Sequence, residues 1–485
     1  MNFKMIFNTT GRVLKTEAAM LALPLLVSVI YKETCAWGFL AAIAVALALG
    51  FALTLAFRPD DRRIYTKEGL VTVALIWMSV SAIGALPFVI SGDIPNYVDA
   101  LFETISGFTT TGASIVTDVE SLGKGILFWR SFTHWIGGMG VLVFVMAVTS
   151  KTTDRSIHLL RAEMPGQEVD KIVPRAKDTA LILYVIYTVM TAVLVVMLLC
   201  GGMSLYDSVV HAFGAAGTGG FSIKADGIAG YNAYIQWVLA IFMLLFSVNF
   251  NLYYVVLIGK FKNFFKSTEL WVFVGVVFVG VTTVTLNILS SCQNFAEALR
   301  LGTFQVSSIV STTGYATADF NAWPTLSKTV LLLLMLMGGC AGSTAGGFKV
   351  SRVVIIIKKI FGNLKKAVHP RTTNVIKMDG KRVPDETIDG VTSYSLVYML
   401  LLFLIVLLLS FDTRLPSSSA LETNITAAVS CFNNVGPGLS LVGPAENYAF
   451  YSHFSKIVLS FAMLLGRLEI YPILLTLSPM FWIKK

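Results

Sequence analysis

Four short stretches of glycine, threonine and other small residues are where this sequence could do chemistry. They read Thr110-Thr111-Gly112-Ala113, Gly217-Thr218-Gly219-Gly220, Thr312-Thr313-Gly314-Tyr315 and Asn434-Val435-Gly436-Pro437. Each has glycine third, and each follows an apolar segment too short to cross a hydrocarbon core of about 30 Å. Backbone that leaves the helical path at membrane depth has free carbonyl oxygens, and it is tolerated where it lines a watery cavity. Four such loops around one axis could therefore replace the water shell of a dehydrated cation.

Acidic residues near the start of each short segment also favour a cation. They are Asp99, Asp207, Glu297 and Glu422, and a carboxylate stabilises a helix N-terminus. The negative C-terminal ends of these half-helices would then point at the loops. Glycine is also common where membrane helices pack, so any one stretch could be a simple helix contact. The recurrence of the pattern in all four quarters of the chain favours the loops.

The elements that position these loops must be membrane helices. Of the 485 residues, 55% are hydrophobic and 13% are charged, and the mean hydropathy is +0.74. That is more apolar surface than a soluble domain can bury, and the long apolar runs indicate helices rather than barrel strands. The formal net charge of +9 comes from basic residues in loops between apolar runs. This is the positive-inside pattern of a protein in a lipid bilayer, and no nucleic-acid site is predicted.

The order of the apolar runs predicts a repeated architecture. Residues 16–31 and 36–57 form an opening hairpin, and then a crossing helix, a half-helix, a loop and a return helix follow four times. The crossing helices are 70–90, 181–200, 270–289 and 393–409, the half-helices 97–108, 205–216, 295–310 and 420–432, and the return helices 126–148, 235–257, 327–357 and 455–481. We predict an all-α polytopic membrane protein with a pseudo-fourfold pore, about ten transmembrane helices and four re-entrant half-helices.

The domain boundaries follow from this order. Residues 1–57 are the N-terminal transmembrane hairpin, 58–150 pore repeat 1, 151–266 pore repeat 2, 267–364 pore repeat 3, and 365–485 a cytoplasmic loop with pore repeat 4. Every basic cluster then falls on one side, so both termini are predicted to be cytoplasmic. The first apolar run follows basic residues as a signal peptide would, but no clear small-residue cleavage site follows it, so we predict a helix.

The third return helix contains a glycine-rich stretch in the middle of its span. Its residues are Gly338, Gly339, Cys340, Ala341, Gly342, Ser343, Thr344, Ala345, Gly346 and Gly347. A continuous helix would be weak there. The stretch could be a tight packing surface, but we favour a broken helix whose loop lies beneath the four loops and blocks or opens the pathway. It is not a phosphate-binding loop, because Phe348 separates Gly347 from Lys349 and no strand precedes it.

Arg467 lies near the middle of the last apolar run, where a charge costs at least about 2.5 to 3.5 kcal/mol. An ion pair with Glu469 would satisfy it, but we favour a positive charge in the permeation path. The five cysteines are scattered singly, and the five histidines show no metalloenzyme spacing. The sequence therefore indicates neither a metal centre nor an enzyme.

The chain resembles the TrkH/TrkG/Ktr/HKT superfamily of potassium transporters over essentially its full length, and within it the bacterial TrkH type. The motifs that carry the resemblance are residues 109–114, 217–222, 311–315, 433–438, 128–130, 135–140 and 465–469. The opening hairpin favours the TrkH type over the shorter KtrB type. In the family, glycine at all four filter positions accompanies potassium selectivity, and Gly112 argues for potassium here.

The resemblance implies the rest of the functional picture. K+ is the transported ion, and the carbonyls of Thr111, Thr218, Thr313 and Val435 are predicted to bind it. The resemblance also implies gating by the 338–347 loop and Arg467, a homodimer, a cytosolic nucleotide-binding TrkA-like regulatory ring and the bacterial cytoplasmic (inner) membrane. The alternative is a cation symporter with alternating access, coupled to H+ or Na+. All four repeats run in the same direction, which favours a pore.

Overall fold

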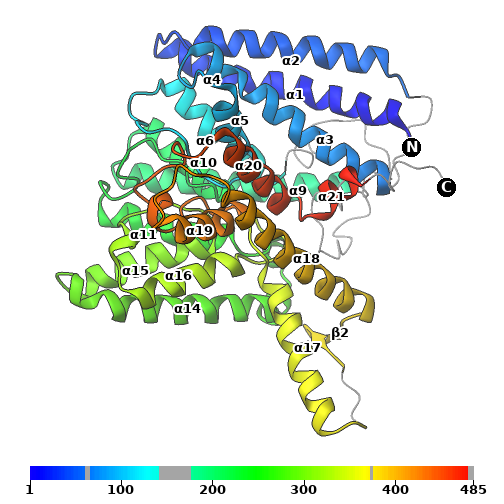
Figure 1. The fold of residues 1–485 in the computed structure, drawn as a ribbon, viewed down its shortest axis with the longest axis vertical. Coiled ribbons are helices and arrows are strands. Elements are labelled where there is room, and N and C mark those ends of the chain that lie inside the picture. Colours follow the sequence, from blue (N-terminus) through cyan, green and yellow to red (C-terminus); the bar gives the residue numbers. More distant parts are fainter. Residues whose placement is uncertain (60–65, 141–175, 372–374, 479–485) are drawn as a thin grey trace.

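The computed structural model describes residues 1–59, 66–140, 176–371 and 375–478, and it is helical almost throughout (Figure 1). Within these ranges, six helices are long and apolar enough to cross a membrane, or up to seven if a bent pair is one span. The chain is therefore a multi-pass membrane protein. The six candidate spans are α1 (Phe3–Ile30), α2 (Ala36–Ala56), α3 together with α4 (Thr66–Gly84 and Leu86–Ser91), α9 (Ala176–Cys200), α14 (Thr268–Ile288) and α18 (Asp385–Leu409).

The opening hairpin is confirmed, although α1 begins at Phe3 and not at residue 16 as predicted. Its two helices approach closely where Gly11 faces Gly50. A Cβ at either glycine would lie 2.9 Å from the carbonyl oxygen of the other. Lys15 lies within α1 and donates a hydrogen bond to Thr54 Oγ1 at 2.9 Å. Small residues thus let the two backbones meet, as is usual between membrane helices.

The four half-helices occupy the predicted positions to within one residue. They are α5 (Tyr97–Phe108), α10 (Leu205–Gly217), α15 (Phe295–Val310) and α19 (Ala420–Phe432). The predicted acids lie in their first turns: Asp99, Asp207, Glu297 and Glu422. The side chains of Asn96, Ser204 and Asn294 accept hydrogen bonds from first-turn amides of α5, α10 and α15. The N-termini of these three helices are therefore capped.

The return segments are shorter and more broken than predicted. The expected helix 235–257 divides into α11 (Ala233–Phe246) and α12 (Phe250–Leu257), which meet at 89°. The expected helix 455–481 divides into α20 (His453–Arg467) and α21 (Tyr471–Leu477), and the residues of that prediction after 478 lie outside the described ranges. Both predictions of a continuous helix were wrong. The first return segment is α6 (Lys124–Gly138), and the part of its prediction after residue 140 likewise lies outside the described residues.

The predicted break in the third return segment is confirmed, since α16 (Thr325–Met337) and α17 (Val350–Val368) are separated by residues 338–349. In Figure 1, α17 extends beyond the rest of the molecule, and a short hairpin lies beside it. The remaining elements are α13 (Phe261–Phe265), β1 (Lys377–Met378), β2 (Lys381–Arg382), and the 3₁₀ turns η1 (Leu289–Ser291), η2 (Phe320–Ala322) and η3 (Ser440–Val442).

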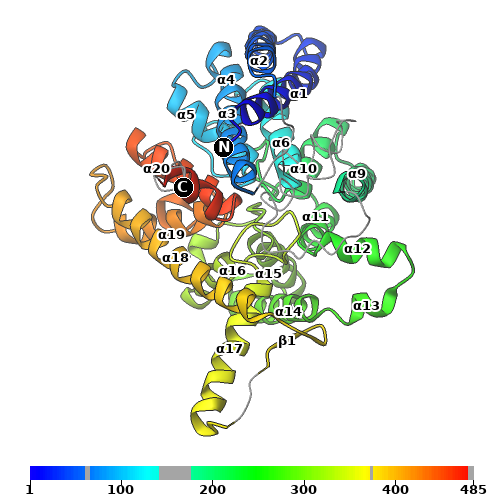
Figure 2. The same cartoon turned by 90° about the vertical axis from the view of Figure 1, so that its right-hand side faces the viewer.

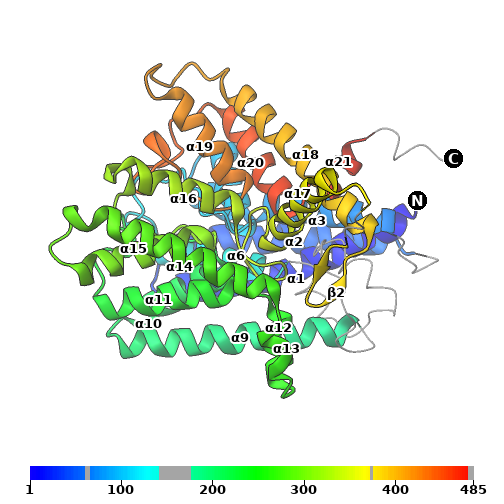
Figure 3. The same ribbon diagram turned by 90° about the horizontal axis from the view of Figure 1, so that it is seen from below.

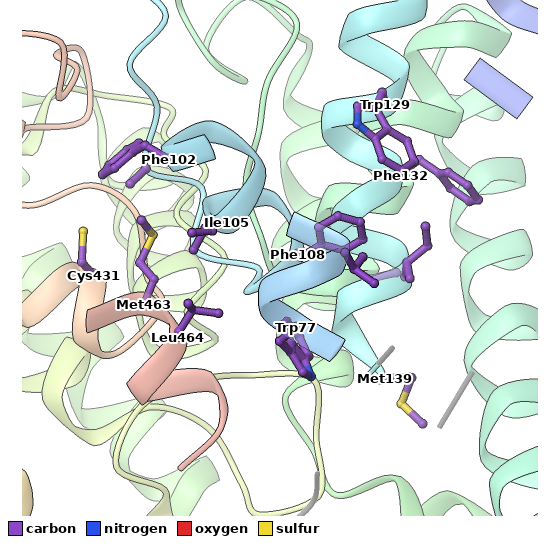
Figure 4. Packing of buried hydrophobic residues seen from close by; sticks show 14 of the residues in the cluster. Trp77, Phe102, Ile105, Phe108, Trp129, Phe132, Met139, Cys431, Met463 and Leu464 are labelled. Atoms are coloured by element: carbon purple, nitrogen blue, oxygen red, sulfur yellow. The ribbon is translucent and has the colours of Figure 1, made fainter. Parts of the chain in front are cut away.

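The helices form four groups, each with one of the half-helices, and the four groups surround a common centre (Figure 2). Aromatic and aliphatic side chains pack both within and between these groups. Phe108 of α5 lies 5.8 Å from Trp129 of α6, measured between ring centroids. On its other side α5 lies towards Met463 and Leu464 of α20 (Figure 4). The half-helix α5 is thus packed between α6 and α20, and this fixes the loop that follows it.

Candidate functional site

The loops after the half-helices share one backbone conformation. Thr110, Thr218, Thr312 and Asn434 have φ values of 56°, 56°, 58° and 56°, and two residues further on Gly112, Gly220, Gly314 and Gly436 have 78°, 77°, 82° and 100°. Non-glycine residues rarely adopt such angles. The glycine equivalent to Gly112 is therefore Gly220, and the sequence register that used Gly219 is wrong by one residue in the second loop.

Between the two left-handed positions, each loop holds one residue whose amide is tied back to its own half-helix. Thr111 N donates to Ser106 O, Gly219 N to Gly214 O, Thr313 N to Ser308 O and Val435 N to Ser430 O, all at 2.8–2.9 Å. No residue in the described part of the chain donates a hydrogen bond to the carbonyl oxygens of these four residues. The four oxygens thus have no protein donor, while the backbone that carries them is held in place.

These four carbonyls form a closed ring with the four glycines. A Cβ on Gly112 would clash with the Gly219 carbonyl oxygen, one on Gly220 with that of Thr313, and one on Gly314 with that of Val435. The ring closes where a Cβ on Gly436 would lie 2.6 Å from the oxygen of Thr111. Each loop therefore contacts the next around the centre. By this geometry Gly219, and not Thr218, contributes the oxygen equivalent to those of Thr111, Thr313 and Val435.

A cavity of about 160 Å³ opens on one side of the ring. The glycines of all four loops line it, as do Ala113, Tyr315 and Pro437. Charged side chains also reach it, namely Arg130, Lys224 and Glu446. The ring is thus reached from this side through a cavity large enough to hold water molecules.

A buried ion pair supports the ring from behind. Arg130 of α6 contacts Glu103 of α5 at 2.7 Å, and both side chains are almost fully buried. Glu103 also accepts hydrogen bonds from Ser114 Oγ and Ile115 N, while Arg130 NH1 donates to Ser222 O. The pair therefore links the first loop to the second. Sequence reasoning did not identify Glu103.

His134 lies one turn further along α6 and is fully buried. Its Nδ1 lies 2.8 Å from Gly107 O, and its Nε2 accepts a hydrogen bond from Phe221 N at 3.3 Å. Gly219 packs so closely on the imidazole that a Cβ there would clash with it. His134 is therefore a spacer between the first half-helix and the second loop.

The glycine-rich stretch 338–347 lies directly against the ring. Gly346 N donates to Thr312 Oγ1 at 2.6 Å, and a Cβ on Gly346 would clash with Asn433 O. Thr344 Oγ1 donates to Phe246 O, and Cys340 N donates to Ser247 O at 3.0 Å. The stretch thus contacts the third and fourth loops and the bend between α11 and α12.

Arg467 connects this stretch to the opposite side of the ring. Its guanidinium donates to Thr344 O at 2.8 Å, to Gly137 O at 2.5 Å and to Gly138 O at 2.6 Å. Glu469, the partner considered from the sequence, pairs with Arg352 of α17. A positive charge held by three backbone carbonyls therefore lies between the end of α6 and the glycine-rich stretch.

Comparison with known proteins assigns this architecture. The TrkH family model, described as a cation transport protein, matches residues 37–484. The chain belongs to the TrkH family. Among its relatives, the Trk system potassium uptake protein TrkH of Salmonella typhimurium is 34% identical over 99% of this chain and 100% of that protein. The Trk system potassium uptake protein TrkG of Escherichia coli is 31% identical over 95% of this chain and 94% of its own.

A solved structure agrees over the whole chain. The crystal structure of the potassium transporter TrkH from Vibrio parahaemolyticus matches with a TM-score of 0.89 and 31% identity, covering 100% of both chains. The fold predicted from the sequence, an all-α polytopic membrane protein of the TrkH family, is thereby confirmed.

Proposed function

We propose that this chain is the membrane subunit of a potassium uptake system and that K+ passes through the ring of the four loops. The relatives are named as Trk system potassium uptake proteins, which supports potassium as the substrate. The closed contact of four glycines with four carbonyls is the observation that carries the proposal. It brings the oxygens of Thr111, Gly219, Thr313 and Val435 together without protein donors.

The chemistry of the ring is ion dehydration. A K+ ion that leaves the outer cavity exchanges water oxygens for carbonyl oxygens, and the exchange costs little reorganisation where the oxygens are already aligned. Hydrogen bonds from the backbone amides of the same four residues keep the oxygens aligned. Their acceptors are the carbonyl oxygens of Ser106, Gly214, Ser308 and Ser430. The half-helices end at these loops, and their partial negative charges attract a cation.

The glycine-rich stretch and Arg467 then limit the flow. In the arrangement described here, the stretch is bonded to Thr312 at the ring and to Arg467. A cation leaving the ring towards them meets backbone that fills the path and a positive charge. Opening requires the bond from Arg467 to Thr344 O to break, because that bond holds the stretch to α20.

The membrane subunit acts with partners in this proposal. We expect a homodimer in the bacterial cytoplasmic membrane with both termini in the cytosol, where a nucleotide-binding TrkA-like ring regulates it. The protruding α17 carries a basic last turn with Lys365 and Lys366, and this is where a cytosolic partner could push or pull on the glycine-rich stretch.

Potassium and rubidium uptake in a bacterium without its own potassium uptake tests the proposal, with sodium as competitor and expression matched. We expect potassium-selective uptake by the native chain and loss of selectivity in Gly112→Ser, Gly220→Ser and Gly314→Ser. Gly390→Ser is the matched control, because nothing lies within 4 Å of a Cβ there. Equal selectivity in all variants would remove the ring from the pathway. Uptake that then depended on a sodium or proton gradient would favour the symporter.

A further inference from the structure

An apolar groove of about 460 Å³ lies between α14 on one side and the segment that contains α11, α12 and α13 on the other. One wall is formed by Leu244 of α11, Val248 in the bend after it, Tyr253 of α12 and Phe264 of α13, and the other by Phe273 and Val277 of α14. Almost none of its surface is polar. In a membrane protein such a groove takes up the hydrocarbon chain of a lipid, because apolar walls match an acyl chain and offer nothing to a polar ligand.

The wall formed by α13 also carries positive charge. Lys260, Lys262 and Lys266 lie within and beside this five-residue helix, and all three are exposed. None of them forms an ion pair with a residue in the described ranges. Phe264, between the last two lysines, lines the groove itself. The lysines of α13, whose positive charge suits a lipid phosphate, thus lie next to the groove that would hold the hydrocarbon chain.

The neighbouring elements place this end at the level of lipid headgroups. Trp271, in the first turn of α14, is half exposed and donates from its indole nitrogen to Phe265 O at 2.8 Å. Tryptophan is typical of the membrane–water boundary. The β1–β2 hairpin meets the same end, where Asp379 accepts a hydrogen bond from Thr268 N. Asp379 brings one acidic group, while Lys377 and Lys381 of the hairpin add basic ones, and Arg382 is paired with Asp385. Figure 3 shows α12 and α13 projecting beside the start of α14, away from the central ring.

We propose that this groove binds an anionic phospholipid, with an acyl chain between α11 and α14 and the phosphate against Lys260, Lys262 and Lys266. Basic residues near a bilayer surface attract anionic lipids, and the apolar groove fixes where one of them stays. A zwitterionic lipid fits the groove equally well but gains less from the lysines.

The site lies directly behind contacts that hold the glycine-rich stretch. Val248 of the groove follows Ser247, whose carbonyl accepts from Cys340 N, and Leu270 follows Glu269, whose carboxylate accepts from Ala341 N at 2.7 Å. A lipid in the groove therefore packs against the bend and the helix that anchor the stretch. This consequence for gating rests on the proposed function, whereas the binding site does not.

Native mass spectrometry of the purified full-length protein tests the site, with phosphatidylglycerol and phosphatidylcholine of the same acyl chains as probes. We expect the native chain to prefer phosphatidylglycerol. Lys262→Gln with Lys266→Gln should weaken phosphatidylglycerol binding at least about fivefold, since one basic residue near an anionic surface contributes about that factor. Lys365→Gln with Lys366→Gln, at the far end of α17, is the matched control and should leave binding unchanged.

A second pair of variants tests the hydrocarbon part. Val274→Trp fills the groove and should reduce the occupancy of both lipids. Val279→Trp is the control, because Val279 is also exposed on the same helix but lies outside the groove. Unchanged lipid preference in the lysine variant, or unchanged occupancy in Val274→Trp, would overturn the proposal. So would a dimer that dissociates in Val274→Trp with lipid binding intact, because a second copy would then cover the groove. Lipid binding is measured without transport, so it can succeed where the proposed function fails.

Discussion

Gly220→Ala should damage the ring through the backbone, and Gly219→Ala should not. Gly220 has φ of 77°, and its Cβ would clash with the carbonyl oxygen of Thr313 in the next loop. Gly219 has no left-handed φ, and its Cβ would clash with the ring of His134. Alanine is therefore unfavourable at these two neighbouring positions for different reasons.

The expected loss for Gly220→Ala follows from these two terms. A residue with a Cβ pays about 1–2 kcal/mol for the left-handed conformation, and this lowers the population of the intact ring about five- to thirtyfold. The clash with Thr313 O adds to this, because a carbonyl of the proposed filter must move. Sodium should therefore compete better with rubidium in this variant.

The assay is rubidium flux into proteoliposomes, with and without sodium, for each glycine variant alone and combined with His134→Ala. His134→Ala removes the imidazole that Gly219→Ala would hit. We expect it to recover part of the flux lost by Gly219→Ala and none of that lost by Gly220→Ala, since residues in contact couple in a double-mutant cycle and the Cβ at Gly220 would meet Thr313 O instead of His134. His134→Ala alone is the control for the lost bonds to Gly107 and Phe221. Recovery of Gly220→Ala to the same extent would refute the register and the ring contact.

Three further predictions concern charged side chains. Arg467→Ala removes a charge-assisted bond to Thr344 O worth about 1.5–3 kcal/mol, so the proposed closed arrangement should weaken and rubidium flux should rise by about tenfold or more. Glu103→Gln leaves the buried charge of Arg130 unpaired, which costs about 3–5 kcal/mol and should lower the midpoint of thermal unfolding in detergent. Burial raises the pKa of Asp412, but hydrogen bonds from Ser452 and Ser455 outweigh it and hold the pKa below its usual value. Asp412 should therefore stabilise the fold above the unfolded-state pKa of about 4, and the difference between native and Asp412→Asn in thermal unfolding should disappear as pH falls through the lowered pKa.

Each of these predictions has a contradicting result. Unchanged flux in Arg467→Ala would mean that another contact holds the glycine-rich stretch. Glu446→Gln changes an exposed carboxylate and is the control for Glu103→Gln. Equal midpoints of thermal unfolding for the two variants would show that the buried ion pair does not stabilise the fold. A stability difference for Asp412→Asn that stays constant down to low pH would show that the carboxylate charge is not what Ser452 and Ser455 stabilise.

The half-helices were predictable because their sequences carry the signals of both ends. An acid marks each start, and threonine, asparagine or glycine follows each apolar segment where a span should continue. The glycine-rich break was predictable for the same reason, since glycine weakens a helix wherever it lies. These features are local in the chain.

The other breaks and the register of the second loop were not local. The bend after Phe246 occurs in an apolar run, at a place where Ser247 O accepts from Cys340 N of a different quarter. Gly217-Thr218-Gly219-Gly220 offers adjacent glycines, and only the contact with Thr313 O decides which one belongs to the ring. In the sequence, Glu103 looks like an ordinary polar residue of an amphipathic helix, and only the structure shows that Arg130 lies beside it. In each case a tertiary contact, and not the chain's own propensity, makes the choice.

The four loops share one backbone conformation, but the side chains of their residues with left-handed φ have different hydrogen-bond partners. Asn434 Nδ2 donates to Thr111 Oγ1 at 3.0 Å and to Met463 O at 2.9 Å, so the fourth loop is fixed to the first and to α20. Thr312 Oγ1 instead accepts from Gly346 N. In the third quarter, therefore, the glycine-rich stretch occupies a hydroxyl oxygen one residue away from the ring carbonyl of Thr313. If the stretch moves away, that oxygen becomes available in the same step. Under the proposed gating, opening of the path would therefore also change the set of oxygens at the ring through this one hydrogen bond, a coupling that a rigid plug beneath a symmetric ring would not provide.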